Sequence, residues 1–235
     1  MSVSVHKKFT ETKESPNLYF MNYLKWLVKY RNLYDYFVEL DIGEIVGQGK
    51  VEQWREEIKQ VGLIEKCITV YHPNCVSLED YDKMIKESAS KYVALEGDRP
   101  NRKRIAYLPL IDKARTQGVR VHGFAMTKKD IFDTVPFYSV DSTSWKSGAM
   151  YGQLIAINKS SVYSHVSSVK TRMNLQKMQR SLVANSLYGQ RNLHLSFHKD
   201  TRVARNSRLA LAINSFSHAE TYYTKLWEAR GYVWN

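Results

Sequence analysis

Residues 67–95, CITVYHPNCVSLEDYDKMIKESASKYVAL, carry the pattern that decides the fold. The β-branched run at residues 67–71 predicts a strand, and residues 91–95 predict another. Residues 78–88 between them predict a helix, which Ser77 opens with an aspartate three residues later in an approximate capping box. A strand, a helix and a strand in this order form one β/α unit.

The same unit repeats on both sides of this stretch. Upstream, residues 36–40 predict a strand and residues 51–61 predict a helix that ends at Gly62. Downstream, the pattern predicts helices over residues 105–116 and 128–133 and strands over residues 119–124 and 137–140. Five short strands that alternate with four helices are typical of parallel β/α architecture.

Helical patterns flank these strands at both ends. Residues 18–34 predict an amphipathic helix, and apolar residues at helical spacing predict further helices over residues 167–186 and 206–230. We therefore expect two domains, a β/α region over residues 1–152 and a mainly helical region over residues 153–235 that packs on it. The flanking helices are the available cover for open sheet edges.

Positive charge is concentrated in the C-terminal third. Residues 153–235 hold 12 Lys and Arg against 3 Asp and Glu, whereas residues 1–152 hold 23 against 20, and the whole chain has a formal net charge of +12. Such a field attracts polyanions, so nucleic acid is favoured as partner over an acidic protein, a lipid surface or a merely solvated basic face. The candidate contacts to nucleic acid are Arg172, Lys177, Arg180, Arg191, Lys199, Arg202, Arg205 and Arg208.

Several functional classes lack their sequence signatures. The apolar runs fall far short of the roughly 20 residues that a membrane helix needs, and the polar N-terminus has no secretory pattern. Cys67 and Cys75 cannot build a disulfide framework, and His194 with His198 has no third ligand at metal spacing. The motifs of dinucleotide enzymes, nucleoside triphosphatases, serine hydrolases and zinc proteases are missing. We expect a cytoplasmic protein that binds no metal and does not associate with a membrane.

Polar residues gather at the expected strand ends. Those at or just past a C-terminal end are Asp41, His72, Glu96 with Gly97, His122 and Asp141. Parallel barrels and sheets place ligands and catalytic groups at this rim. We therefore expect an active or binding site there, with Asp41 and Asp141 as its carboxylate pair.

Residues 122–152, HGFAMTKKDIFDTVPFYSVDSTSWKSGAMYG, resemble the C-terminal barrel strands of tRNA-guanine transglycosylases. The likeness is closer to their DNA-acting relatives, which insert 7-deazaguanines into phage or bacterial DNA. HGFAMT matches a Gly-containing turn of that family, KKDIFDTV a short helix, and FYSVDSTSW the nucleophile strand. The resemblance implies that Asp141 is the catalytic nucleophile, which attacks C1′ of the sugar.

The same resemblance implies a base pocket upstream. Asp41, in VELDIG, matches an aspartate that hydrogen-bonds the departing and incoming bases, and His72, in YHPN, lies near the position of a base-reading glutamine. Gly97, in ALEGD, and His122 complete the implied base-binding set. Glu96 stands where the family has a glycine, and the histidine in place of glutamine bears on which 7-deazaguanine is accepted.

The matched region, residues 18–152, begins at about the fourth strand of an eight-stranded barrel. The first three strands and their general-base aspartate are missing, and nothing after Cys75 supplies the sulfurs of the zinc site that the tRNA enzymes carry. Since five strands cannot close a barrel, we expect an incomplete TIM-type α/β fold. About five parallel strands would form a partial barrel over residues 1–152, with basic C-terminal helices added. The sheet stays open, or a second polypeptide or a second copy completes it.

The resemblance implies base exchange in DNA. Asp141 would displace guanine through a covalent aspartyl-glycosyl intermediate, and Asp41 would orient the guanine and the 7-deazaguanine derivative that replaces it. No cofactor is required, since the 7-deazaguanine base is a co-substrate. Two alternatives stay open: a catalytically inactive or accessory DNA-binding homologue, and another barrel enzyme that acts on sugars or nucleosides with the two aspartates as acid and nucleophile.

Overall fold

The chain divides into two compact units, which its computed structural model describes over most of their length. The described residues are 15–72, 77–96, 107–156, 164–166, 179–180 and 183–234. The first unit comprises residues 1–123 and 137–139, and the second comprises residues 124–136 and 140–235. The second unit thus contains most of the segment that resembles the transglycosylases, in addition to the basic C-terminal region.

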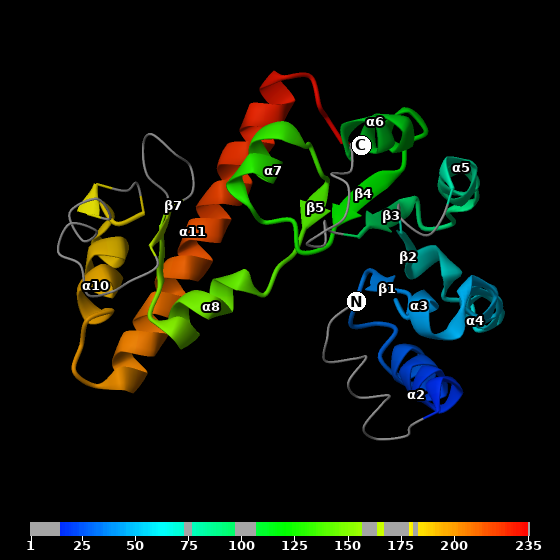
Figure 1. Ribbon diagram of the computed structural model, residues 1–235, viewed down its shortest axis with the longest axis horizontal. Helices are drawn as coiled ribbons and strands as arrows, with labels where there is room; N and C mark the ends of the chain where they lie inside the picture. Colours follow the sequence, from blue (N-terminus) through cyan, green and yellow to red (C-terminus); the bar gives the residue numbers. More distant parts are fainter. Residues whose placement is uncertain are drawn as a thin grey trace. The chain divides into compact units, whose positions relative to one another are not determined.

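Five parallel strands form a curled, half-barrel sheet, so the expected incomplete β/α barrel is confirmed (Figure 1). The strands are β1 (Phe37–Val38), β2 (Cys67–Tyr71), β3 (Tyr92–Leu95), β4 (Arg120–Gly123) and β5 (Ser139–Val140). They neighbour one another in the order β1-β2-β3-β4-β5, which is also their order in the sequence. Each strand lies within the range predicted for it.

The helices of the first unit alternate with these strands. They are α2 (Pro16–Lys29), α3 (Gly43–Val46), α4 (Gln48–Gln60), the 3₁₀ helix η1 (Ile64–Lys66), α5 (Leu78–Glu87) and α6 (Tyr107–Thr116). The predicted capping box of α5 is present, since the Ser77 side chain accepts the Asp80 backbone N–H and the Asp80 side chain accepts that of Ser77. This arrangement satisfies two of the N–H groups that a helix start leaves unpaired.

Helix α2 ends five residues earlier than predicted. The Tyr34 hydroxyl donates to the Leu27 carbonyl, 2.7 Å away, and the Lys66 ammonium donates to the carbonyls of Arg31 and Tyr34, each at 2.8 Å. The Leu27 carbonyl is one that the Arg31 N–H would pair if the helix continued, and the carbonyls of Arg31 and Tyr34 are of the kind that a helix end leaves without a partner. The helical pattern of residues 18–34 therefore stops as a helix at Lys29.

The two faces of the sheet have different partners. On one face, Phe37 and Cys67 pack in an apolar cluster with Phe20 of α2 and Trp54 of α4, whose rings stack with centroids 4.7 Å apart. Successive side chains of a strand point to opposite faces. The opposite face of the sheet therefore carries the side chains that alternate with these. Among them are Tyr92 of β3 and Arg120 of β4, which pair in register.

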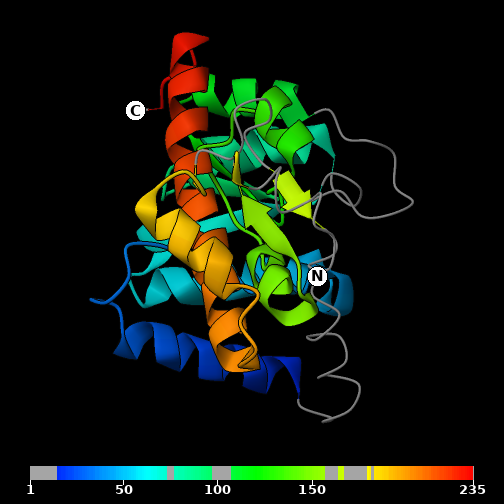
Figure 2. The same cartoon turned by 90° about the vertical axis from the view of Figure 1, so that its left-hand side faces the viewer.

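The second unit is mainly helical. It contains α7 (Lys129–Thr134), α8 (Ser144–Tyr151), β6 (Leu154–Ala156), β7 (Ser164–Val166), α10 (Leu187–Leu195) and α11 (Thr201–Ala229). Helix α10 packs along α11 (Figure 2). Their apolar cluster is built from Leu154, Val183, Ala184, Leu193, Leu211, Ala219 and Tyr223.

The sequence patterns located only part of this second unit. Helix α11 contains nearly all of the predicted range 206–230 and begins earlier, where Asp200 caps the backbone N–H groups of Arg202 and Val203. Most of the predicted helix over residues 167–186 lies outside the described residues. The antiparallel pair β6–β7 and helices α8 and α10 were not predicted. Among the described residues, no helix combines the length and the apolar character needed to cross a membrane.

Candidate functional site

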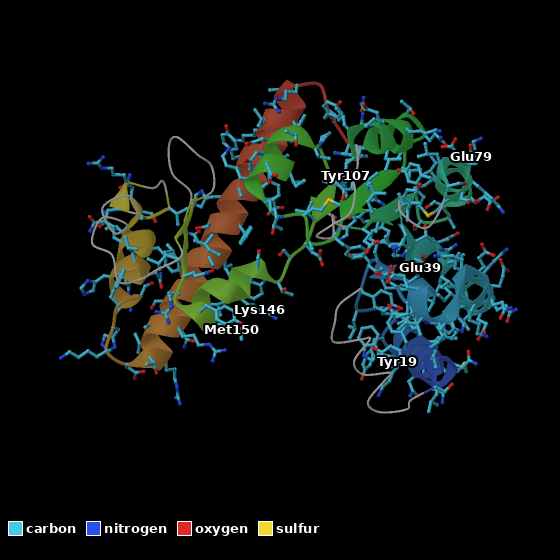
Figure 3. All side chains as sticks on the ribbon, in the orientation of Figure 1. Tyr19, Glu39, Glu79, Tyr107, Lys146 and Met150 are labelled. Carbon is cyan, nitrogen blue, oxygen red and sulfur yellow. The ribbon has the colours of Figure 1, made fainter. Side chains whose placement is uncertain are left out.

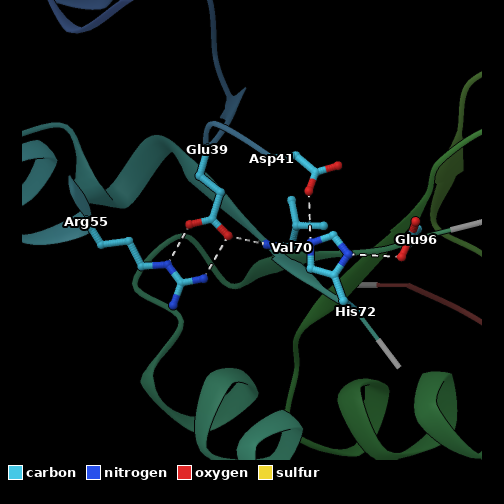
Figure 4. A network of polar contacts seen from close by, with 6 residues as sticks. All are labelled: Glu39, Asp41, Arg55, Val70, His72 and Glu96. Atoms are coloured by element: carbon cyan, nitrogen blue, oxygen red, sulfur yellow. Dashed lines mark hydrogen bonds and ion pairs between the residues drawn. The ribbon is translucent and has the colours of Figure 1, made fainter. Parts of the chain in front are cut away.

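Three strand ends of the first unit bring Asp41, His72 and Glu96 into one hydrogen-bonded group (Figure 4). His72 and Glu96 directly follow β2 and β3, whose register pairs Tyr71 with Leu95 and so places the next two residues side by side. The His72 ring lies between two carboxylates, with Nε2 2.8 Å from Asp41 Oδ1 and Nδ1 3.0 Å from Glu96 Oε2. The predicted rim therefore exists at these three positions.

The charge of His72 follows from this placement. Burial disfavours the imidazolium, but the hydrogen bonds and negative charges of Asp41 and Glu96 outweigh that effect and raise the pKa of His72 to about 10. At neutral pH the ring is therefore an imidazolium that donates one N–H to each carboxylate. The group then has a formal charge of −1, made of two carboxylates and one cation.

Asp41 is the member of this group that solvent reaches best. Its side chain is 28% exposed, against 7% for His72 and 8% for Glu96. A carboxylate fixed at one oxygen by a buried cation can accept adjacent N–H groups from the edge of a guanine-like base. His72 has both ring nitrogens on carboxylates, so it positions Asp41, and direct contact of His72 with a base stays a prediction.

A second charged pair supports the segment between β1 and Asp41. Glu39 is labelled among all side chains in Figure 3, and its side chain is 3% exposed. It pairs with Arg55 of α4 at 2.5 and 2.8 Å and accepts the Val70 backbone N–H at 2.6 Å (Figure 4). Burial lowers the pKa of Arg55, but the hydrogen bonds and charge of Glu39 outweigh this and raise it. The pair links β1, β2 and α4 two residues before Asp41. The sequence shows only an acidic residue inside a predicted strand and gives no sign of its partner.

His122 belongs to a different polar cluster on the sheet. Its Nδ1 lies 2.6 Å from the Ser139 hydroxyl, which also bonds the Tyr92 hydroxyl. The Arg120 guanidinium lies 4.9, 5.0 and 5.1 Å from the ring centroids of Tyr36, Tyr92 and Tyr138. These contacts join β3, β4 and the segment leading to β5, the strand that Asp141 follows.

Asp141 lies in the second unit, directly after β5. Its Oδ1 accepts the Ala125 backbone N–H at 2.9 Å. Ala125 adopts a left-handed conformation with φ of 56°, which is uncommon for a residue with a Cβ. Thr127 and Ser144 further link this turn to α8 through their hydroxyls, 3.2 Å apart. The HGFAMT turn and the start of the DSTSW segment thus form one local structure around an exposed carboxylate.

Each unit carries one of the two predicted carboxylates. Asp41 belongs to the first unit and Asp141 to the second. Gly97, the fourth member of the implied base-binding set, lies outside the described residues.

The predicted nucleic-acid contacts differ in their surroundings. Arg180, Arg191, Lys199, Arg202 and Arg205 are exposed. Arg208 is half-buried, donates from Nη1 to the Ser196 carbonyl at 3.0 Å, and has its pKa lowered by burial. Arg172 and Lys177 lie outside the described residues.

The comparisons with known proteins identify no relative. No family model, no curated protein and no solved structure matches the chain. Among the described residues, no three His, Cys, Asp or Glu side chains are arranged to hold a metal ion. Function is therefore inferred from the residues themselves.

Proposed function

We propose that the protein exchanges guanine for a 7-deazaguanine base in DNA, with Asp141 as the nucleophile and Asp41 as the group that holds the bases. The observation that carries this proposal is that each unit holds one carboxylate in place just past a strand. Asp141 is fixed by the Ala125 N–H, and Asp41 is fixed by the His72 cation. The half-barrel fold and the resemblance of residues 122–152 to guanine transglycosylases support the same reading.

The reaction is a double displacement at C1′. The Asp141 carboxylate forms a bond to C1′ of a flipped deoxyguanosine while the bond from C1′ to guanine N9 breaks. N9 of the incoming 7-deazaguanine then attacks C1′ and releases Asp141. The leaving guanine takes up one proton and the incoming base gives up one, so the exchange needs no net proton, oxidant or cofactor. The 7-deazaguanine base is a co-substrate.

Asp41 contributes orientation. Its carboxylate accepts N–H groups from the base edge, first of guanine and then of the replacing base. His72 holds that carboxylate in place and is itself held by Glu96. The Glu39–Arg55 pair fixes the chain just before Asp41. A preorganised acceptor avoids the reorganisation that a flexible side chain would need when the base binds.

The first prediction concerns Asp141. Asp141→Asn removes the negative charge of the nucleophile, so we expect it to abolish both the covalent adduct with guanine-containing DNA and the release of labelled guanine. The adduct is measured by denaturing electrophoresis, and guanine release is followed with an isotope-labelled oligonucleotide and free 7-deazaguanine bases.

Asp130→Asn is the matched control, because Asp130 is another exposed carboxylate of the second unit, on α7. It should leave adduct and exchange intact. Undiminished adduct formation by Asp141→Asn would remove Asp141 from this role. DNA binding by the parent protein without any guanine release would support the catalytically inactive, DNA-binding alternative instead.

A further inference from the structure

The second unit contains a cavity of about 790 Å³ beside α10. It is lined by Gln179, Ala184, Gln190, Leu193, His194, Phe197, His198 and Lys199. Gln190, Leu193, His194 and Phe197 follow the spacing i, i+3, i+4 and i+7, so one face of α10 and of the turn after it forms a wall. None of the lining residues belongs to the carboxylate sites described above.

The cavity wall is held by close backbone packing. Gly189 of α10 lies against residues 183–184, where an added Cβ would come within 1.6 Å of the Val183 carbonyl oxygen. Ala184 and Leu193 are 1% and 3% exposed and belong to the apolar cluster of this unit. The cavity therefore has an apolar base built into the core.

The other lining groups are hydrogen-bond donors, a cation and an exposed aromatic ring. Lys199 is an exposed cation, and Phe197 is 40% exposed. His198 Nδ1 accepts the Asp200 backbone N–H at 3.1 Å, so the neutral ring carries its proton on Nε2, a donor. Asp200 itself accepts the N–H groups at the start of α11. The described lining contains no carboxylate.

This combination suits an anion that is joined to a flat ring. A lysine and an imidazole donor favour a phosphate, an exposed phenylalanine ring favours an unstacked base, and the amides of Gln179 and Gln190 can meet the polar edges of that base. The volume falls within the range of small-molecule sites, roughly 300–1,000 Å³. Of the eight lining side chains that the structure describes, six are exposed, so the cavity opens to solvent.

We propose that this cavity binds an unstacked nucleotide of a single DNA strand, with its phosphate at Lys199 and its base against Phe197. The choice of DNA as the polymer rests on the proposed function, whereas the preference for a nucleotide rests on the lining alone. In the proposed reaction the cavity would hold the strand that carries the exchanged guanine.

The test is the binding of a fluorescein-labelled oligothymidylate of about 12 nucleotides, followed by fluorescence anisotropy at several salt concentrations. This probe contains no guanine and so reports binding without exchange. Lys199→Ala should weaken binding and reduce the slope of log K against log salt by about one, because one phosphate contact is lost. Phe197→Ala should weaken binding about fivefold or more with an unchanged slope, because a stacked base is lost.

Matched controls on α11 separate the cavity from the general charge of the unit. Lys225→Ala and Tyr222→Ala remove an exposed lysine and an exposed aromatic residue that do not line the cavity, and both should bind as the parent does. Circular dichroism and thermal unfolding confirm that each variant is folded. The parent should bind an oligomer with abasic sites about fivefold or more weakly than it binds oligothymidylate. Phe197→Ala should bind the two oligomers equally, because it has no ring on which a base could stack.

Three results would overturn the inference: cavity variants that bind as the parent does, equal affinity for the abasic oligomer, or equal binding of a polyglutamate peptide of the same charge. Cavity-dependent binding without guanine exchange by the parent would uphold the cavity and reject the exchange reaction. Exchange with no effect of Lys199 or Phe197 would do the reverse.

Discussion

At neutral pH, His72 carries a buried positive charge between Asp41 and Glu96, and this charge links stability to pH. Its pKa of about 10 in the folded protein lies above the ordinary value of 6.5. The stabilisation is therefore fully present below about pH 6.5 and is lost as the pH rises through about 10. Across that interval the folded state holds one proton more than the unfolded state.

We expect the free energy of unfolding to fall with pH in this window, with His72 contributing up to about 1.4 kcal/mol per pH unit. His72→Gln should remove that slope, while His218→Gln, which replaces an exposed histidine of α11, should keep it. Urea unfolding between pH 6.5 and 10 measures both. Parallel curves for the parent and His72→Gln would contradict the placement of the ring between two ionised carboxylates.

The sequence could not predict which side chains of the site form hydrogen bonds with one another. The positions of Asp41, His72 and Asp141 follow from where strands end, which local patterns reveal. The bond from His72 to Glu96 spans 24 residues, and the bond from Arg55 to Glu39 spans 16. Such pairs depend on strand register and helix packing, which a single sequence does not state.

Helix α2 protects the exposed edge of the sheet. β1 has β2 as its single neighbour in the strand order, and the Tyr23 hydroxyl donates to the Val38 carbonyl at 2.6 Å. Burial is the main cause that raises the pKa of Tyr23, and it keeps this hydroxyl protonated. The helix thus satisfies an edge carbonyl that would otherwise be open to another chain.

Tyr23→Phe should therefore destabilise the protein by about 1–2 kcal/mol, because it leaves a partly buried carbonyl without its donor. Denaturant unfolding measures the change. Tyr222→Phe, which alters an exposed tyrosine of α11, should be close to neutral. An equal effect of the two substitutions would show that the Tyr23 hydroxyl does not contribute at this edge.

Elements were predictable where their patterns are strong. β2 and β3 are runs of apolar and β-branched residues that helices cover, and they were located within a residue. β6 and β7 have three residues each and become strands by pairing with each other across the intervening chain. Helix α10 contains a glycine and several polar residues, which weaken its helical pattern.

At the scale of the whole molecule, α2 already covers the sheet edge at β1, so a second copy of the chain is not needed to cover that edge. We expect the protein alone to have the mass of one chain, 27.4 kDa, by light scattering at micromolar concentration. A second copy that completes the barrel would double this mass. A doubled mass would therefore favour completion by a second copy over an open sheet.

The strand order also has a consequence for how the protein is made. Because neighbours in the sheet are neighbours in the sequence, β1 to β4 pair only with the strand just before or just after them. Each newly synthesised strand and helix can therefore dock on the one already in place as the chain leaves the ribosome. The Asp41–His72–Glu96 group would then be assembled as soon as β3 has been added, without any contribution from β5 and Asp141.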